Sequence, residues 1–231
     1  MRNGLYKVEV ASARGFGRGV VVARDGRIFG GNGGYAFAGC ATGSDEEPGF
    51  EIATVLRNVG GDYRPIDDVE PFVLRGQRDE GEYRLTGGTP LLGGDVTAVI
   101  SALSEAAAPP SRPGGPDGIA NGLYSLTIRM LDGIDAGNTG LMLLYDGSIR
   151  GGDALFDYLG AYESAGGRWK GELINHEHTP SQGERPVFGG KEVGIGFSGT
   201  YDADGALGEA TALAGKRSIR FRAVLKKLIA I

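Results

Sequence analysis

The sequence predicts an all-β protein built from two tandem copies of one small antiparallel barrel. The first observation is an internal echo, because the segment NGLY occurs at Asn3 and again at Asn121. The second is the 43 glycines among 231 residues, which suit many tight turns between short strands. The third is the lack of a long stretch with helical periodicity. Together they favour two β-meanders over a helical or a disordered chain.

An amphipathic strand opens each half. After each NGLY, apolar residues recur at every second position: Tyr6, Val8 and Val10 in the first half, and Tyr124, Leu126 and Ile128 in the second. A period of two places such side chains on one face of a strand. We expect these residues to face a core, together with Ile28 and Ile149.

A tight hairpin follows that strand in each half. Two segments align without a gap over their full length: GVVVARDGRIFGGN from Gly19 and GLMLLYDGSIRGGD from Gly140. Asp-Gly between two apolar runs indicates a type I′ turn, whose two central residues need positive φ. The predicted turn and structural residues are Asp25, Gly26, Gly30, Gly31, Asp146, Gly147, Gly151 and Gly152.

The remaining sequence sets the domain boundaries. We expect the first copy over residues 1–104, a Pro- and Gly-rich linker over residues 105–120 and the second copy over residues 121–231. In the later part of each copy we align Tyr83 with Ile195, and an alternating strand closes each copy. About seven or eight short strands predict an up-and-down barrel, because closure removes exposed edges. A sandwich is the alternative.

Charge and composition exclude several classes of function. The formal net charge of −5 argues against direct nucleic-acid binding, and no run of about 18 apolar residues predicts a membrane span. The single cysteine, Cys40, excludes an internal disulfide and fits a reducing compartment. The first residues already alternate as a strand and carry no secretory signal, so we expect a cytoplasmic location.

No motif indicates catalysis or a cofactor. The glycines at 15, 17 and 19 are spaced as in a dinucleotide loop, but a strand follows where that loop needs a helix. The segment GFSGT at Gly196 only approaches a nucleophile elbow. We therefore expect a protein without enzyme activity and without a cofactor.

The two histidines are weak candidates for a metal site. His176 and His178 lie two residues apart, so on one strand they would share a face and form a zinc pincer. A third ligand is needed, and Glu172 is the nearest in sequence. The same face would be highly polar, which favours a solvent-facing strand over a metal site.

The order of NGLY, Asp-Gly, Gly-Gly-Asn/Asp and the later YAFAG at Tyr35 or FDYLG at Phe156 resembles the GrlR family. That family consists of negative regulators of type III secretion genes. The resemblance spans nearly the whole chain, once per copy. It implies a lipocalin-like barrel that binds a transcriptional activator and does not catalyse a reaction.

The resemblance also implies a partner-binding site. The known regulator carries an acidic run shortly after its Gly-Gly segment, and Asp45, Glu46 and Glu47 stand at a similar place in the first copy. Taken by charge alone, such a run is more typical of a solvated loop. Because the known regulator pairs two chains, the resemblance further implies an intramolecular pseudo-dimer of the two copies.

Two functions follow from these observations. The first is a non-enzymatic regulatory protein that acts by binding a protein partner, such as a transcriptional regulator. The alternative is a lipocalin-like barrel that binds a small apolar ligand, because barrels of about eight strands either fill with side chains or hold one small molecule. Bulky Tyr, Phe, Leu and Ile residues at inward positions favour a filled interior, and hence the first function.

Overall fold

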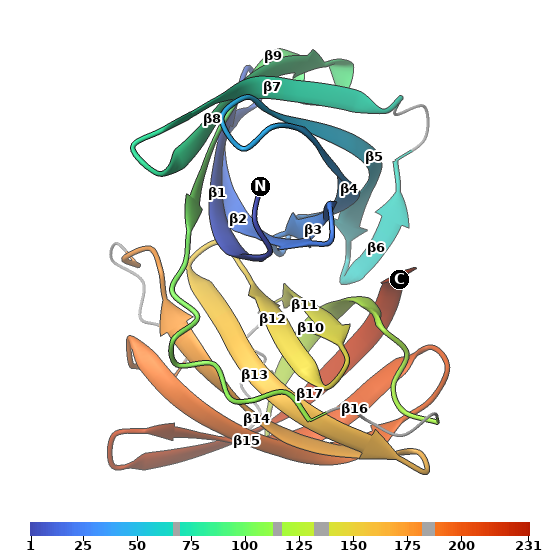
Figure 1. The fold of residues 1–231 in the computed structure, drawn as a ribbon. Helices are drawn as coiled ribbons and strands as arrows, with labels where there is room; N and C mark the ends of the chain where they lie inside the picture. The colour runs from blue at the N-terminus through green and yellow to red at the C-terminus, as the bar shows by residue number, and fades with distance from the viewer. Residues whose placement is uncertain (67–69, 113–116, 132–138, 182–187) are drawn as a thin grey trace. The chain divides into compact units, whose positions relative to one another are not determined.

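The computed structural model describes residues 1–66, 70–112, 117–131, 139–181 and 188–231, and it is all-β (Figure 1). The chain forms two compact units, Met1–Ser104 and Glu105–Ile231. Each unit contains a closed antiparallel barrel with eight strands in its ring, which confirms the predicted fold. Within the described ranges the helical content is one short 3₁₀ turn, Pro90–Leu92, and no helix there is long and apolar enough to cross a membrane.

The first barrel runs up and down around its ring. Its ring strands are β1 (Gly4–Ser12), β2 (Gly15–Arg24), β3 (Arg27–Gly31), β4 (Tyr35–Gly43), β5 (Pro48–Val59), β7 (Phe72–Asp79), β8 (Glu82–Thr89) and β9 (Gly94–Ala102). Pairing of β1 with β9 and of β4 with β5 completes the ring. A ninth strand, β6 (Asp62–Pro65), pairs with the last residues of β5, while β7 pairs with residues 49–52 of the same strand.

The second barrel has the same connectivity without the additional strand. It comprises β10 (Gly122–Met130), β11 (Thr139–Tyr145), β12 (Ser148–Gly152), β13 (Phe156–Ala165), β14 (Arg168–Glu177), β15 (Glu192–Tyr201), β16 (Gly205–Ala214) and β17 (Arg217–Ala230). Neighbours in the chain are neighbours in the ring, and pairing of β10 with β17 closes it.

The segment expected to be a linker belongs to the second unit. Ile119 is buried in the core of that unit, and its N–H donates to Ser164 Oγ at 2.9 Å. Arg112 forms an ion pair with Glu172 at 3.0 Å. The described part of this segment therefore packs along the second barrel as an extended strap. Its prolines lack the N–H groups that would let it join the sheet.

In each barrel the NGLY motif and the Asp-Gly turn are joined by hydrogen bonds. In the first barrel, Asn3 Nδ2 donates to Asp25 Oδ1 at 2.9 Å, and the Asp25 N–H donates to Asn3 Oδ1 at 2.8 Å. In the second barrel, Asn121 and Asp146 make the same pair of bonds at 2.9 and 3.0 Å. The asparagine of NGLY thus ties the start of the first strand to the next hairpin turn, which explains why both motifs recur together.

The predicted turn residues adopt the conformations that their sequence requires. Asp25 and Gly26 have φ of 50° and 76°, and Asp146 and Gly147 have φ of 44° and 77°. Positive φ at both central positions is the signature of the predicted type I′ turn. The Gly-Gly pairs that follow, Gly30-Gly31 and Gly151-Gly152, end β3 and β12.

Each core is built from the inward positions of the strands. The residues expected to face the interior do so: Tyr6, Val8, Ile28, Tyr124, Leu126, Ile128 and Ile149 are core members, and Val10 packs against the first core. The alternation of each strand is therefore read correctly from the sequence.

A substitution at Gly151 tests the close approach of β11 and β12. A Cβ at this position would lie 2.0 Å from the Leu141 carbonyl oxygen, whereas a Cβ at Gly196 would meet open space. Gly151→Ala should lower the free energy of unfolding by about 1–3 kcal/mol, as overpacking does. Gly196→Ala should change it by less than about 0.5 kcal/mol. Urea denaturation followed by Trp169 fluorescence measures both, and equal stability of the two variants would contradict the packing.

Candidate functional site

The first barrel encloses an apolar cavity of about 270 Å³. Inward side chains from several strands form its wall, among them Val8, Val10, Val21, Phe50, Ile52 and Ala98. Phe16 and Tyr35, which are 58% and 38% exposed, line it where it meets solvent. A buried apolar cavity of about 150 Å³ is enough to take up benzene. The cavity is therefore large enough for a small apolar molecule.

Large side chains pack together in the described core of the second barrel. Trp169 and Phe197 pack with their ring centroids 4.5 Å apart, and Phe188 and Phe221 with theirs 5.2 Å apart. Burial raises the pKa of the Tyr124 hydroxyl to about 12. The expectation of a filled interior is thus wrong for the first barrel, and the described core of the second barrel is packed with large side chains.

The difference arises from side-chain size at matched positions. Strand pairing fixes which inward residues of the two barrels correspond, and at four positions around the cavity the second barrel carries the larger side chain. The pairs, first barrel before second, are Val8 and Leu126, Val10 and Ile128, Val21 and Met142, and Val96 and Phe221. All four larger residues belong to the second core. The first barrel thus has the smaller side chain at these four lining positions, although at Phe50, which is matched with Gly171, it has the larger one.

A polar network closes the opposite end of the first barrel. Tyr6 and Tyr83 pack edge to face with ring centroids 6.0 Å apart. The Tyr83 hydroxyl donates to Asp45 Oδ1 at 2.7 Å, and Arg78 Nη1 lies 2.6 Å from Asp45 Oδ2. Burial, followed by the hydrogen bond to Asp45, raises the pKa of Tyr83. The Tyr83 hydrogen bond and the charge of Arg78 lower the pKa of Asp45.

Within the predicted acidic run, only Asp45 takes part in this network. Asp45 turns toward Tyr83 and Arg78, and its side chain is only 24% exposed. Glu46 and Glu47 are exposed, and across the described part of the chain neither forms an ion pair. The structure therefore gives Asp45 a role in holding the barrel end together, and it leaves two acidic side chains facing solvent.

The two histidines, weak candidates for a zinc pincer, have separate hydrogen-bond partners. His176 Nδ1 lies 3.0 Å from Asp157 Oδ1, while His178 lies beyond the end of β14 with Nδ1 2.9 Å from Thr179 Oγ1. Glu172, the suggested third ligand, pairs with Arg112. Within the described ranges no three His, Cys, Asp or Glu side chains gather as a metal site would need. The sequence reading missed Asp157, a buried carboxyl whose pKa burial raises and the His176 hydrogen bond lowers.

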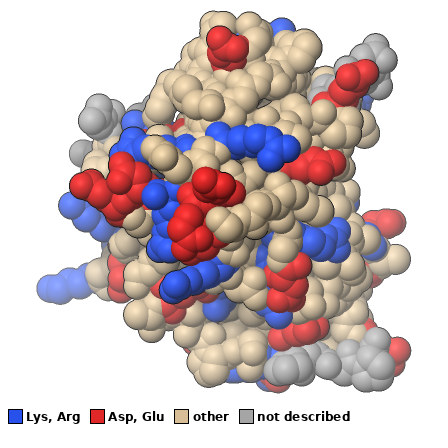
Figure 2. Space-filling view, turned by 45° about the horizontal axis from the view of Figure 1, so that its top comes forward, with Lys and Arg blue, Asp and Glu red and all other residues tan. Residues whose placement is uncertain are grey.

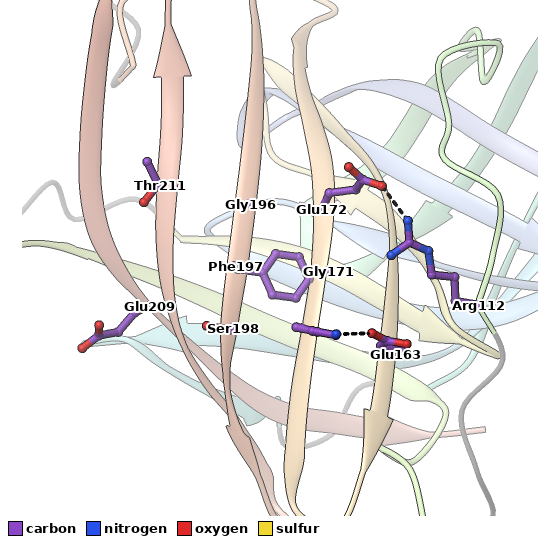
Figure 3. Close-up of a pocket in the computed structure, with 10 residues that line it drawn as sticks. Arg112, Glu163, Gly171, Glu172, Gly196, Phe197, Ser198, Glu209 and Thr211 are labelled. Carbon is purple, nitrogen blue, oxygen red and sulfur yellow. Dashed lines mark hydrogen bonds and ion pairs between the residues drawn. The ribbon is translucent and has the colours of Figure 1, made fainter.

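A shallow depression of about 580 Å³ lies on the outer side of β14, β15 and β16 (Figure 3). Small residues such as Gly196 and Ser198 form its floor. Its charged rim is neutralised locally, because Glu163 pairs with Lys170 at 2.8 Å and Glu172 pairs with Arg112. Such exposed pairs contribute little and leave no net charge to attract a ligand. This depression is a weaker candidate than the apolar cavity.

Surface charge is mixed. On the face drawn in Figure 2, basic and acidic side chains lie interspersed and do not gather into a large field of one sign. Proteins that bind nucleic acid need clustered basic residues to contact phosphates. This face offers no such cluster.

Comparison with known proteins adds a likeness of fold only. No protein-family model matches the chain, and no curated protein matches it. One similar solved structure is a putative outer membrane protein from Bacteroides fragilis, with 14% identity, a TM-score of 0.28, and 97% of this chain and 96% of that chain covered. Another is a mutant of transferrin binding protein B from Haemophilus parasuis, with 9% identity, a TM-score of 0.26, and 90% of this chain and 59% of that chain covered.

Replacing Asp45 tests the network at the closed end. A carboxyl whose pKa is lowered by folding contributes stability above its unfolded pKa of about 4, and this contribution is lost as the pH falls through the folded value. Asp45→Asn should therefore lower the free energy of unfolding at pH 7 by roughly 1 kcal/mol. The gap to the unsubstituted protein should shrink as the pH falls below about 4.

Circular dichroism during urea denaturation measures this difference, with Glu46→Gln as the matched control. Fluorescence of Trp169, the single tryptophan, reports on the second barrel and should not change. A gap between Asp45→Asn and the unsubstituted protein that stays constant from pH 7 to pH 3 would contradict the assignment.

Proposed function

We propose that this protein is a non-enzymatic binding protein whose first barrel takes up a small apolar molecule. The observation that carries the proposal is the apolar cavity of about 270 Å³ in the first barrel. Ligand sites are typically concave and mostly apolar, with a few polar groups at fixed places. The cavity wall has this composition.

The size of the cavity limits the ligand. Scaling from benzene in a cavity of about 150 Å³, the volume accommodates about ten carbon atoms. Each buried methylene group contributes about 0.8 kcal/mol to the affinity. Ten such groups give roughly 8 kcal/mol, so a micromolar dissociation constant is the tightest binding to expect, and the cost of fixing the chain in place weakens it.

Filling the cavity should abolish binding of an apolar ligand. Val10 lines the cavity, whereas its neighbour Ala11 is exposed and pairs with the exposed Phe16. Val10→Phe should reduce the affinity for decanol at least tenfold, and Ala11→Phe should leave it unchanged. Isothermal titration calorimetry measures both, with circular dichroism confirming that each variant is folded. Equal binding by the two variants, or no binding by the unsubstituted protein, would refute the proposal.

A second candidate function is regulation through a protein partner, as the resemblance to the GrlR family implies. The observation that favours it is the loop at the closed end of the first barrel, where Asp45 is anchored while Glu46 and Glu47 face solvent. Rigidly presented acidic side chains suit a basic surface on a transcriptional regulator. This function does not exclude ligand binding in the cavity.

Reversing the two exposed charges tests the second candidate. The Glu46→Lys/Glu47→Lys variant should lose capture of a specific partner from a native bacterial lysate, because like charges then oppose the basic surface. The control is Glu51→Lys/Asp95→Lys, which makes the same change of net charge at two other exposed sites of the first unit. Identical captured proteins for both variants would eliminate the acidic loop as a docking site.

A further inference from the structure

We infer that the ligand of the first barrel is a single-chain anionic amphiphile, whose apolar tail fills the cavity and whose acidic head contacts Arg14 at the mouth. This inference rests on the proposed ligand-binding function and adds the chemical class of the ligand. It follows from the polar groups that line an otherwise apolar cavity.

Most polar side chains along the cavity are already engaged. Arg18 Nε lies 2.9 Å from Glu9 Oε1 in an ion pair. Asn32 Oδ1 accepts hydrogen bonds from the Gly34 and Tyr35 N–H groups, and its Nδ2 donates to the Arg18 carbonyl oxygen. Ser12 Oγ bonds within the β1–β2 turn. These groups shape the mouth and have little capacity left for a ligand.

Arg14 and Tyr35 differ from these residues, because the polar groups of their side chains are not engaged by other described side chains. Both line the cavity and are exposed to solvent. Within the described residues, no carboxylate pairs with the Arg14 guanidinium and no hydrogen bond engages the Tyr35 hydroxyl. The two side chains therefore bring five guanidinium donors and one hydroxyl to the opening of an apolar chamber.

The charge at the mouth selects the sign of the head group. The wall residues include Arg14 and Arg18 and, among the described residues, no aspartate or glutamate. Glu9 pairs with both Arg18 and Lys7, and Arg14 adds a positive charge that no carboxylate of the described residues pairs with, so the mouth is net positive. A carboxylate there gains a charge-assisted hydrogen bond, whereas a quaternary ammonium group would be repelled.

The cavity volume selects a single chain. About 270 Å³ is below the usual range of pockets for larger ligands, and the scaling used above gives about ten carbons. A medium-chain carboxylate such as decanoate fits both the volume and the charge. A two-chain lipid does not fit the volume.

Three probes with the same ten-carbon chain test the head group: decanoate, decanol and decyltrimethylammonium. Calorimetry should show the unsubstituted protein binding decanoate at least fivefold more tightly than decanol, and the ammonium compound most weakly. Arg14→Gln should remove the preference for decanoate over decanol. Raising the salt concentration should weaken decanoate binding alone, since only that contact is ionic.

Arg27→Gln is the matched control, because it makes the same change of net charge on the exposed β2–β3 turn. It should retain the preference for decanoate. Equal affinities for decanoate and decanol in the unsubstituted protein, or a preference that survives Arg14→Gln, would overturn the inference while leaving the proposed function intact. Failure of all three probes to bind would instead overturn the proposed function.

Discussion

Both units depend on the backbone pairing that joins the first strand of each copy to the last. β1 pairs with β9, and β10 pairs with β17, so the sheet has no free edge at that seam. Without this closure the inward apolar face of every strand would meet water. Hydrogen bonds join Asn3 to Asp25 in the first barrel and Asn121 to Asp146 in the second. They hold the first three strands of each barrel in position, and the last strand then pairs with the first of these.

Because closure is a property of the backbone, the interior can change while the ring stays the same. The two barrels keep the same order of ring strands and the same Asp-Gly turn, yet they differ at inward positions such as Val96 and Phe221. Smaller residues there leave the hydrogen-bonded ring intact and open a chamber inside it. The first unit thus has a cavity at positions where the second unit carries larger core residues, and the proposed ligand binding rests on this cavity.

The sequence predicts the parts of the fold that depend on local pattern. Asp-Gly turns and alternating strands follow from steric rules within a few residues, so β1–β4 and β10–β13 are assigned correctly. The later alignment of Tyr83 with Ile195 is wrong, since Tyr83 lies on the seventh ring strand and Ile195 on the sixth. Every strand shows the same alternation of apolar and polar residues. An alignment that is displaced by one whole strand therefore still matches this pattern, and the error is not visible in the sequence. The cavity and the Asp45–Tyr83 contact join residues from distant strands, which no local pattern reveals.

The energetics of the cavity argue that it is retained for a purpose. At about 24 cal/mol per Å³, an empty cavity of this volume costs at most about 6 kcal/mol relative to a filled interior, and less where water enters at its mouth. That is comparable with the whole stability of a small domain, about 5–15 kcal/mol. The second barrel shows that the same ring accepts larger side chains, so filling is structurally available. Under the proposed ligand binding, an apolar molecule in the cavity would restore part of the lost contacts and stabilise the first barrel by mass action.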